Sequence, residues 1–108
     1  MPNLKVYIDR DVRDGGLPVE ARKDLRNVLI DRLGAPPAAC QIAVLPVQGL
    51  PDQPAANIEL ALMPGPERTV EVLTELGQAL QSVIRQHAEV DSAFRCTLLD
   101  PESYVTLK

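Results

Sequence analysis

The stretch Pro2-Asn3-Leu4-Lys5-Val6-Tyr7-Ile8 recurs 54 positions later as Ala56-Asn57-Ile58-Glu59-Leu60-Ala61-Leu62. Each copy begins with a small or cyclic residue and an asparagine, and in each copy the even-numbered residues that follow are the more apolar ones. Alternation with a period of two is typical of a β-strand that buries one face. The repeat therefore predicts two equivalent strands, one at the start of each half of the chain.

A helix is predicted after each of these strands. Pro18 suits the first turn of a helix, and Gly34 ends the helical spacing that follows it. The second helix is predicted from about Val70 to His87. The predicted helical faces consist of Ala21, Leu25, Val28, Leu29, Arg32 and Leu33 in the first helix, and of Leu73, Leu76, Leu80, Val83 and Ile84 in the second.

Each helix leads into another short apolar segment. The first runs from Cys40 to Leu45 and is predicted to end at Pro46, and residues 95–99 match its last five positions at the same offset of 54. The chain is thus predicted to be one domain, 1–108, with internal repeats 2–46 and 56–100. Right-handed crossovers then predict an α/β (α+β) fold in which a four-stranded sheet carries two helices on one face. The even-numbered strand residues are expected to meet the helices.

The other face of the predicted sheet is too apolar to remain fully hydrated, and no third helix is available to cover it. Its residues are Lys5, Tyr7, Ala43, Leu45, Ala61, Met63, Thr97 and Leu99. Another copy of the chain is the expected cover. The tail from Glu102 onward has strand-like residues and could pair with the sheet edge of such a neighbour.

Composition excludes several classes of partner. The formal net charge of −4 and the lack of a basic run argue against nucleic acid. No apolar run is long enough to cross a bilayer and the N-terminus has no targeting pattern, so a cytoplasmic protein without membrane contact is expected. Cys40 and Cys96 lack the neighbours that a zinc site requires, and the acidic residues are scattered. We therefore expect buried free thiols and no metal.

Three further segments carry a resemblance to a known family. They are the Met1-Pro2 start, the segment from Gly34-Ala35-Pro36-Pro37 into Gln41–Val44, and Arg68-Thr69-Val70-Glu71. With the duplicated β-α-β layout, they make the chain similar to the tautomerase superfamily, which includes 4-oxalocrotonate tautomerase and macrophage migration inhibitory factor. The resemblance implies a homotrimer with pockets near subunit boundaries. It also implies proton transfer in a small enol or keto acid, without a metal or an organic cofactor.

Pro2 is the candidate catalytic residue that this resemblance implies. Enolisation needs a base whose pKa lies close to the working pH, and a free α-amino group has a pKa of about 7.7–8.0. Removal of Met1 would make Pro2 such a base, whereas an attached Met1 leaves the nitrogen of Pro2 in an amide. In the alternative interpretation Pro2 only begins a strand.

Four residues are candidates for binding the substrate: Gln41, Arg95, Arg10 and Tyr104. Gln41 stands where the resemblance places an arginine, and an amide cannot form a bidentate ion pair. Its repeat partner Arg95 is the favoured donor to a carboxylate or enolate, the alternative being a salt bridge. The resulting hypothesis is an isomerase of the tautomerase type. Its rival is a non-catalytic trimer of the same fold that binds a small ligand or a protein.

Overall fold

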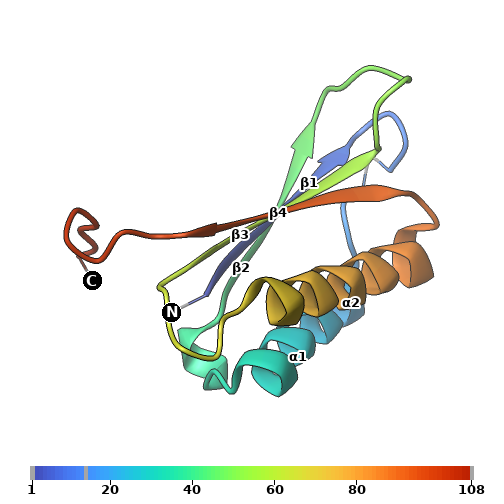
Figure 1. The fold of residues 1–108 in the computed structure, drawn as a ribbon. Helices are drawn as coiled ribbons and strands as arrows, with labels where there is room; N and C mark the ends of the chain where they lie inside the picture. Colours follow the sequence, from blue (N-terminus) through green and yellow to red (C-terminus); the bar gives the residue numbers. More distant parts are fainter. Residues whose placement is uncertain (1, 14, 108) are drawn as a thin grey trace.

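The computed structural model describes residues 2–13 and 15–107 and contains one four-stranded sheet with two helices on one side (Figure 1). The elements are β1 (Asn3–Asp9), α1 (Val19–Leu33), the short 3-10 helix η1 (Pro37–Ala39), β2 (Gln41–Val47), β3 (Ala56–Leu62), α2 (Val70–Ala88) and β4 (Ser92–Leu98). The strand order is β2-β1-β3-β4. Strands β1 and β2 are parallel, as are β3 and β4, and β1 and β3 meet in antiparallel orientation. The predicted duplicated β-α-β fold is confirmed.

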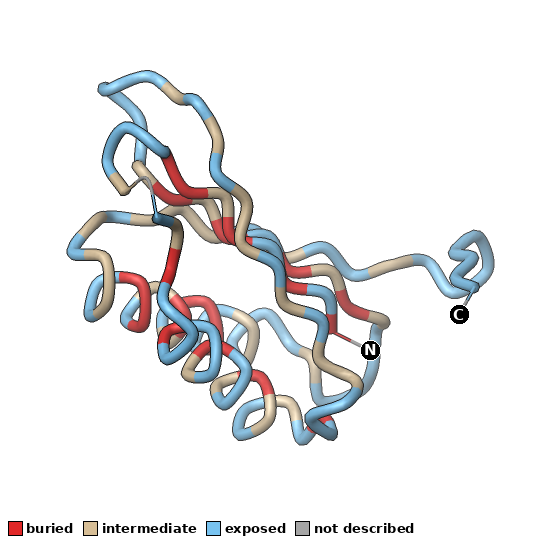
Figure 2. Tube along the Cα trace, turned by 180° about the vertical axis from the view of Figure 1, so that it is seen from behind, coloured by how far each residue is buried: buried red, intermediate tan, exposed pale blue. Residues whose placement is uncertain are grey.

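The core lies between the sheet and the two helices (Figure 2). Even-numbered residues of the two central strands are fully or almost fully buried: Leu4, Val6, Ile8, Ile58, Leu60 and Leu62. The helices bury Ala21, Leu25, Leu29, Leu76, Leu80, Val83 and Ile84 against them. The predicted shared face is therefore the helix face. Leu98 departs from it, being 42% exposed because it ends an edge strand.

Strand β2 is longer than predicted, because it continues through Pro46 to Val47. The backbone N–H of Gln41 points toward β1 and donates to the carbonyl of Pro2, with an N···O distance of 2.9 Å. Since backbone donors alternate in direction along a strand, the nitrogen of Pro46 points away from β1, to the free edge of the sheet. A proline there costs no ladder hydrogen bond, so the prediction that Pro46 ends the strand was wrong.

Close packing of α2 on β4 depends on Gly77, which is buried in the middle of the helix. A Cβ atom at this position would lie 2.8 Å from the Cγ of Phe94 and closer still to two other carbons of the ring. The absence of a side chain at Gly77 thus allows the aromatic ring of β4 to sit against the helix backbone. The helices themselves are linked by His87 of α2, whose Nε2 lies 2.8 Å from Asp24 Oδ2 of α1.

The C-terminal segment leaves the sheet after β4 and projects from the body of the molecule (Figure 1). Asp100 organises a turn in it, since its carbonyl accepts the N–H of Tyr104 at 2.9 Å. Beyond the turn, Val105 is 79% exposed and Leu107 is 90% exposed. None of the described helices is both long and apolar enough to cross a membrane.

Candidate active site

Pro2 lies at the start of β1, at the end of the sheet where β2 also begins. Its side chain is fully buried, and its carbonyl accepts the N–H of Gln41. The antiparallel register of β1 and β3 pairs Asn3 with Ala61, which places Pro2 beside Leu62. Pro2 is therefore held between strands β2 and β3 by the regular pairing of the sheet.

A wide cavity of about 740 Å³ opens beside Pro2. It is lined by Asn3, Gln41, Met63, Leu99, Tyr104, Thr106 and Leu107, and Pro2 itself is not among the lining residues. The predicted site residues Gln41 and Tyr104 thus face the same space, one from β2 and the other from the C-terminal segment. The lining offers amide and hydroxyl groups together with apolar side chains, and none of the described residues that line it is charged.

Arg95 lies in a separate cavity of about 230 Å³ on the open face of the sheet. Its guanidinium donates to Asn57 Oδ1 at 3.2 Å. Arg95 precedes Leu98 by three positions in β4, and β4 is two strands from β1, so Arg95 is roughly 10 Å along and roughly 10 Å across the sheet from Pro2. One chain does not bring these two residues together, although Asn3 lines both cavities.

Arg10 lies at the far end of β1 from Pro2, just beyond Asp9. The two positions are eight residue steps apart along the strand, which corresponds to roughly 26 Å. The loop that carries Arg10 is fixed by Asp9, a buried carboxylate that accepts the N–H of Asp11 at 2.9 Å. A single chain therefore presents Arg10 and Pro2 at opposite ends of the sheet.

Sequence reasoning missed Asn3 as a residue of the site. Its side chain is exposed on the open face, adjacent to Pro2 and common to both cavities. The alternation of β1 could have predicted this position. Odd-numbered residues of β1 point to the open face, and Asn3 directly follows the candidate base. Arg68, by contrast, has a structural role, since its guanidinium donates to the carbonyl of Met63 and closes the loop before α2.

The two cysteines are free thiols and are both half-buried. Burial raises the pKa of the Cys40 thiol, and the positive charge of Arg26 offsets part of that rise. The pKa of Cys96 is also raised by burial, with a smaller opposing effect of Arg68. Among the described residues no group of three or more His, Cys, Asp or Glu side chains is placed to hold a metal ion.

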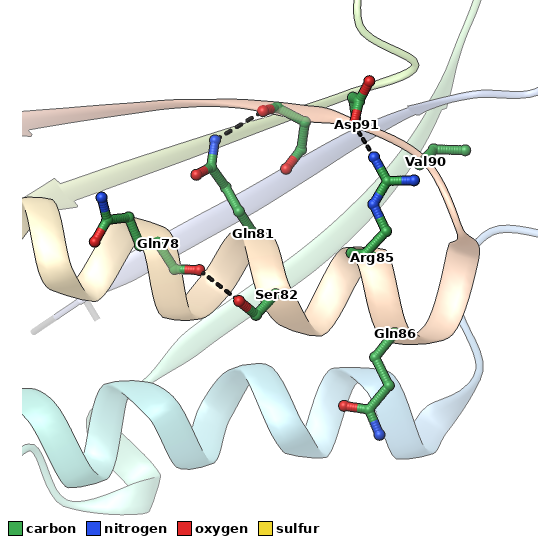
Figure 3. A pocket seen from close by; sticks show the side chains of 8 residues that line it. Gln78, Gln81, Ser82, Arg85, Gln86, Val90 and Asp91 are labelled. Carbon is green, nitrogen blue, oxygen red and sulfur yellow. Dashed lines mark hydrogen bonds and ion pairs between the residues drawn. The ribbon is translucent and has the colours of Figure 1, made fainter.

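Another depression, of about 580 Å³, lies between α2 and the start of β4, away from Pro2 (Figure 3). Four of its polar side chains are bonded to one another or to the backbone, whereas the buried Oγ of Ser92 has no hydrogen-bond partner among the described residues. Gln81 donates to the carbonyl of Ser92 at 2.8 Å, Ser82 donates to the carbonyl of Gln78, and Arg85 pairs with Asp91. None of the predicted site residues lines this depression.

Comparison with known proteins places this geometry in context. No protein-family model matches the chain, and no curated protein matches its sequence. Solved structures do match over almost its whole length. A macrophage migration inhibitory factor-like protein from Entamoeba histolytica superposes with a TM-score of 0.70 at 16% identity, covering 97% of this chain and 94% of the other. A fused 4-OT, described as an asymmetric trimer, gives a TM-score of 0.74 at 18% identity, covering 96% of this chain and 91% of the other.

A third similar structure is that of a protein inactivated by 2-oxo-3-pentynoate. It has a TM-score of 0.69 and 18% identity, over 90% of this chain and 85% of the other. At these identities the likeness establishes the fold. The chain adopts the tautomerase/MIF fold, as the sequence resemblance predicted.

Proposed function

We propose that the protein is a tautomerase that moves a proton within a small enolisable carboxylate, using Pro2 as general base and then as general acid. The observation that carries the proposal is the position of Pro2 at the start of β1, beside a cavity of about 740 Å³, in a tautomerase/MIF fold. Removal of Met1 would turn the nitrogen of Pro2 into a secondary amine. Neither a metal nor an organic cofactor is needed for such a proton transfer.

The groups around Pro2 fit the remaining requirements of enolisation. A base must be accompanied by donors that stabilise the negative charge on the enolate oxygen. Gln41, Asn3 and Tyr104 supply neutral donors in the cavity. The apolar side chains Met63 and Leu99 lower the polarity of the same space, which favours the neutral amine over its protonated form.

A homotrimer completes this proposed site. Pro2 and Arg10 lie at opposite ends of β1, so a guanidinium from Arg10 reaches the amine only if a neighbouring copy supplies it. Trimeric assembly is reported for the fused 4-OT structures with the same fold. The exposed side chains of the C-terminal segment would then be covered by a neighbour.

The second candidate function is a non-catalytic trimer that binds a small ligand or a protein. It is favoured by the full burial of Pro2 and by the neutral side chain of Gln41 in the cavity. The two candidates differ in whether a free amine at Pro2 is required.

A covalent probe tests whether Pro2 carries that free amine. The compound 2-oxo-3-pentynoate inactivates a protein of this fold. Because it is an ynone, a free amine can add to its activated triple bond, and the whole reagent then remains attached. We expect intact-mass spectrometry to show that Met1 is absent and that one reagent is added, with peptide mapping placing it on Pro2. Labelling only of Cys40 or Cys96, or retained Met1 in protein that still turns over enol acids, would contradict the proposal.

The role of Arg95 is tested by its replacement with glutamine. Because one chain keeps Arg95 away from Pro2, the proposal requires a neighbouring copy to supply Arg95 to the substrate carboxylate. Loss of that charge-assisted hydrogen bond should raise KM for phenylpyruvate about tenfold, with a smaller change in kcat. Arg85→Gln removes the same charge from an ion pair on α2 and should leave both constants unchanged. Equal kinetics of Arg95→Gln and wild type would assign Arg95 to its hydrogen bond with Asn57 alone.

A further inference from the structure

A basic groove runs between α1 and the outer edge of β2. It has a volume of about 350 Å³ and is lined by Val19, Arg22, Lys23, Arg26, Cys40, Gln41 and Ile42. Arg22, Lys23 and Arg26 follow Val19 by three, four and seven positions. The four residues therefore form one stripe along α1. This stripe faces the first residues of β2, and it places three cations along one wall of the groove.

These cations have no acidic partner in the described part of the chain. Arg22, Lys23 and Arg26 are all exposed, and none is within 4.0 Å of a described carboxylate. The nearby carboxylate Asp24 is instead directed to His87 of α2. Arg22 and Arg26 are one helical turn apart, an arrangement of like charges that destabilises a helix slightly. The sign of this group of cations is opposite to the net charge of −4 of the whole chain.

Cys40, on the opposite wall of the groove, lies within the electrostatic influence of the cations. The charge of Arg26 acts on the thiol of Cys40, where it lowers a pKa that burial raises. The thiol itself donates to the carbonyl of Pro36 at 3.6 Å, which fixes it at the base of β2. An anion in the groove would therefore contact guanidinium groups on one side and lie near Cys40 on the other.

We infer that this groove binds a small, multiply charged anion of the phosphate or polycarboxylate class through Arg22, Lys23 and Arg26. Each guanidinium group can donate two parallel hydrogen bonds to the oxygens of a phosphate or carboxylate group. The ammonium group of Lys23 adds a third positive charge. The groove lies on the helix side of the sheet, opposite the open face on which the subunit contacts are proposed, and it shares Gln41 with the cavity beside Pro2. The inference does not depend on catalysis at Pro2.

Inorganic pyrophosphate and citrate serve as probes, with sodium chloride at matched ionic strength as the reference. We expect isothermal titration calorimetry of the full chain to detect binding of at least one of the two probes. Arg22→Gln and Arg26→Gln should each weaken that binding about tenfold, since each removes charge-assisted hydrogen bonds. Arg32→Gln removes the same charge from the other end of α1, where Arg32 pairs with Glu75, and should leave binding within about twofold of wild type.

Thiol alkylation locates the bound anion. A saturating probe should slow the alkylation of Cys40, because it shields the thiol and counteracts the charge of Arg26, whereas the rate at Cys96 should not change. Preference for pyrophosphate or for citrate assigns the ligand to the phosphate or the polycarboxylate class. Three results would overturn the inference: heat of binding that chloride reproduces, an equal loss of affinity in Arg32→Gln, or unchanged alkylation of Cys40 in the presence of the saturating probe.

Discussion

Replacement of Pro2 by alanine is expected to lower kcat/KM for enol-acid ketonisation by about 10²- to 10⁴-fold, the usual contribution of a positioned general base. Alanine still provides a primary amine at the N-terminus once Met1 is removed. It lacks the ring that fixes the backbone angle φ, and its amine has different basicity and freedom of motion. The remaining activity should therefore come from this less well positioned amine together with the donors of the cavity, such as Gln41 and Tyr104.

A matched control keeps the proline ring and removes only the amine. In a chain that keeps one residue attached before Pro2 after processing, the proline ring and its neighbours are unchanged. The nitrogen of Pro2 is then part of an amide and cannot accept a proton. We expect this extended chain to be at least as inactive as Pro2→Ala, with the same circular dichroism spectrum as wild type. If the extended chain ketonises phenylpyruvate at the wild-type rate, Pro2 is not the base.

Substitution of Gly77 by alanine is expected to destabilise the protein by about 1–3 kcal/mol, the usual cost of overpacking a core. The added Cβ would meet the ring of Phe94 at less than 3.0 Å, so α2 or β4 must shift. Intrinsic helix propensity acts in the opposite direction, because alanine is favoured over glycine in a helix interior by about 1 kcal/mol. A net loss of stability therefore means that the contact with Phe94 dominates.

Urea denaturation of four proteins separates these effects: wild type, Gly77→Ala, Phe94→Leu and the double variant, all at one protein concentration. The smaller side chain at position 94 should relieve the clash, so the double variant should lose less stability than the sum of the single variants. Gly65→Ala is the control, since its Cβ would lie 3.9 Å from its nearest neighbour, the Cδ atom of Arg68, which is ordinary van der Waals contact. Additive losses in the double variant would place the strain elsewhere.

The layout of the fold was predictable because each half of the chain repeats the same physical signals. Alternation marks β1 and β3, and Gly34 ends α1 in the left-handed conformation, with φ of 67°, that glycine adopts without strain. The end of β2 was not predictable in the same way. Whether Pro46 breaks a strand depends on which side of the strand is paired, and that is decided by β1 rather than by the local sequence.

The candidate site was only partly predictable. Gln41 and Tyr104 do share the cavity beside Pro2, but Arg95 lies in the adjoining one. The distance between Pro2 and Arg95 depends on how β1, β3 and β4 are aligned with one another. The residue pattern within each strand does not determine that alignment. The separation of Arg10 from Pro2 follows from the length of β1 alone, so it could have been deduced from the alternation.

Pro46 has a consequence for the behaviour of the protein at high concentration. The outer edge of β2 is free in one chain, and free edges promote uncontrolled growth of sheets into fibrils. Pro46 removes one outward-pointing donor near the end of this edge, so another strand can form a regular ladder only with the part of β2 that precedes it. The proline thus limits which strands can join the sheet, and it restricts the edge to short and specific pairing.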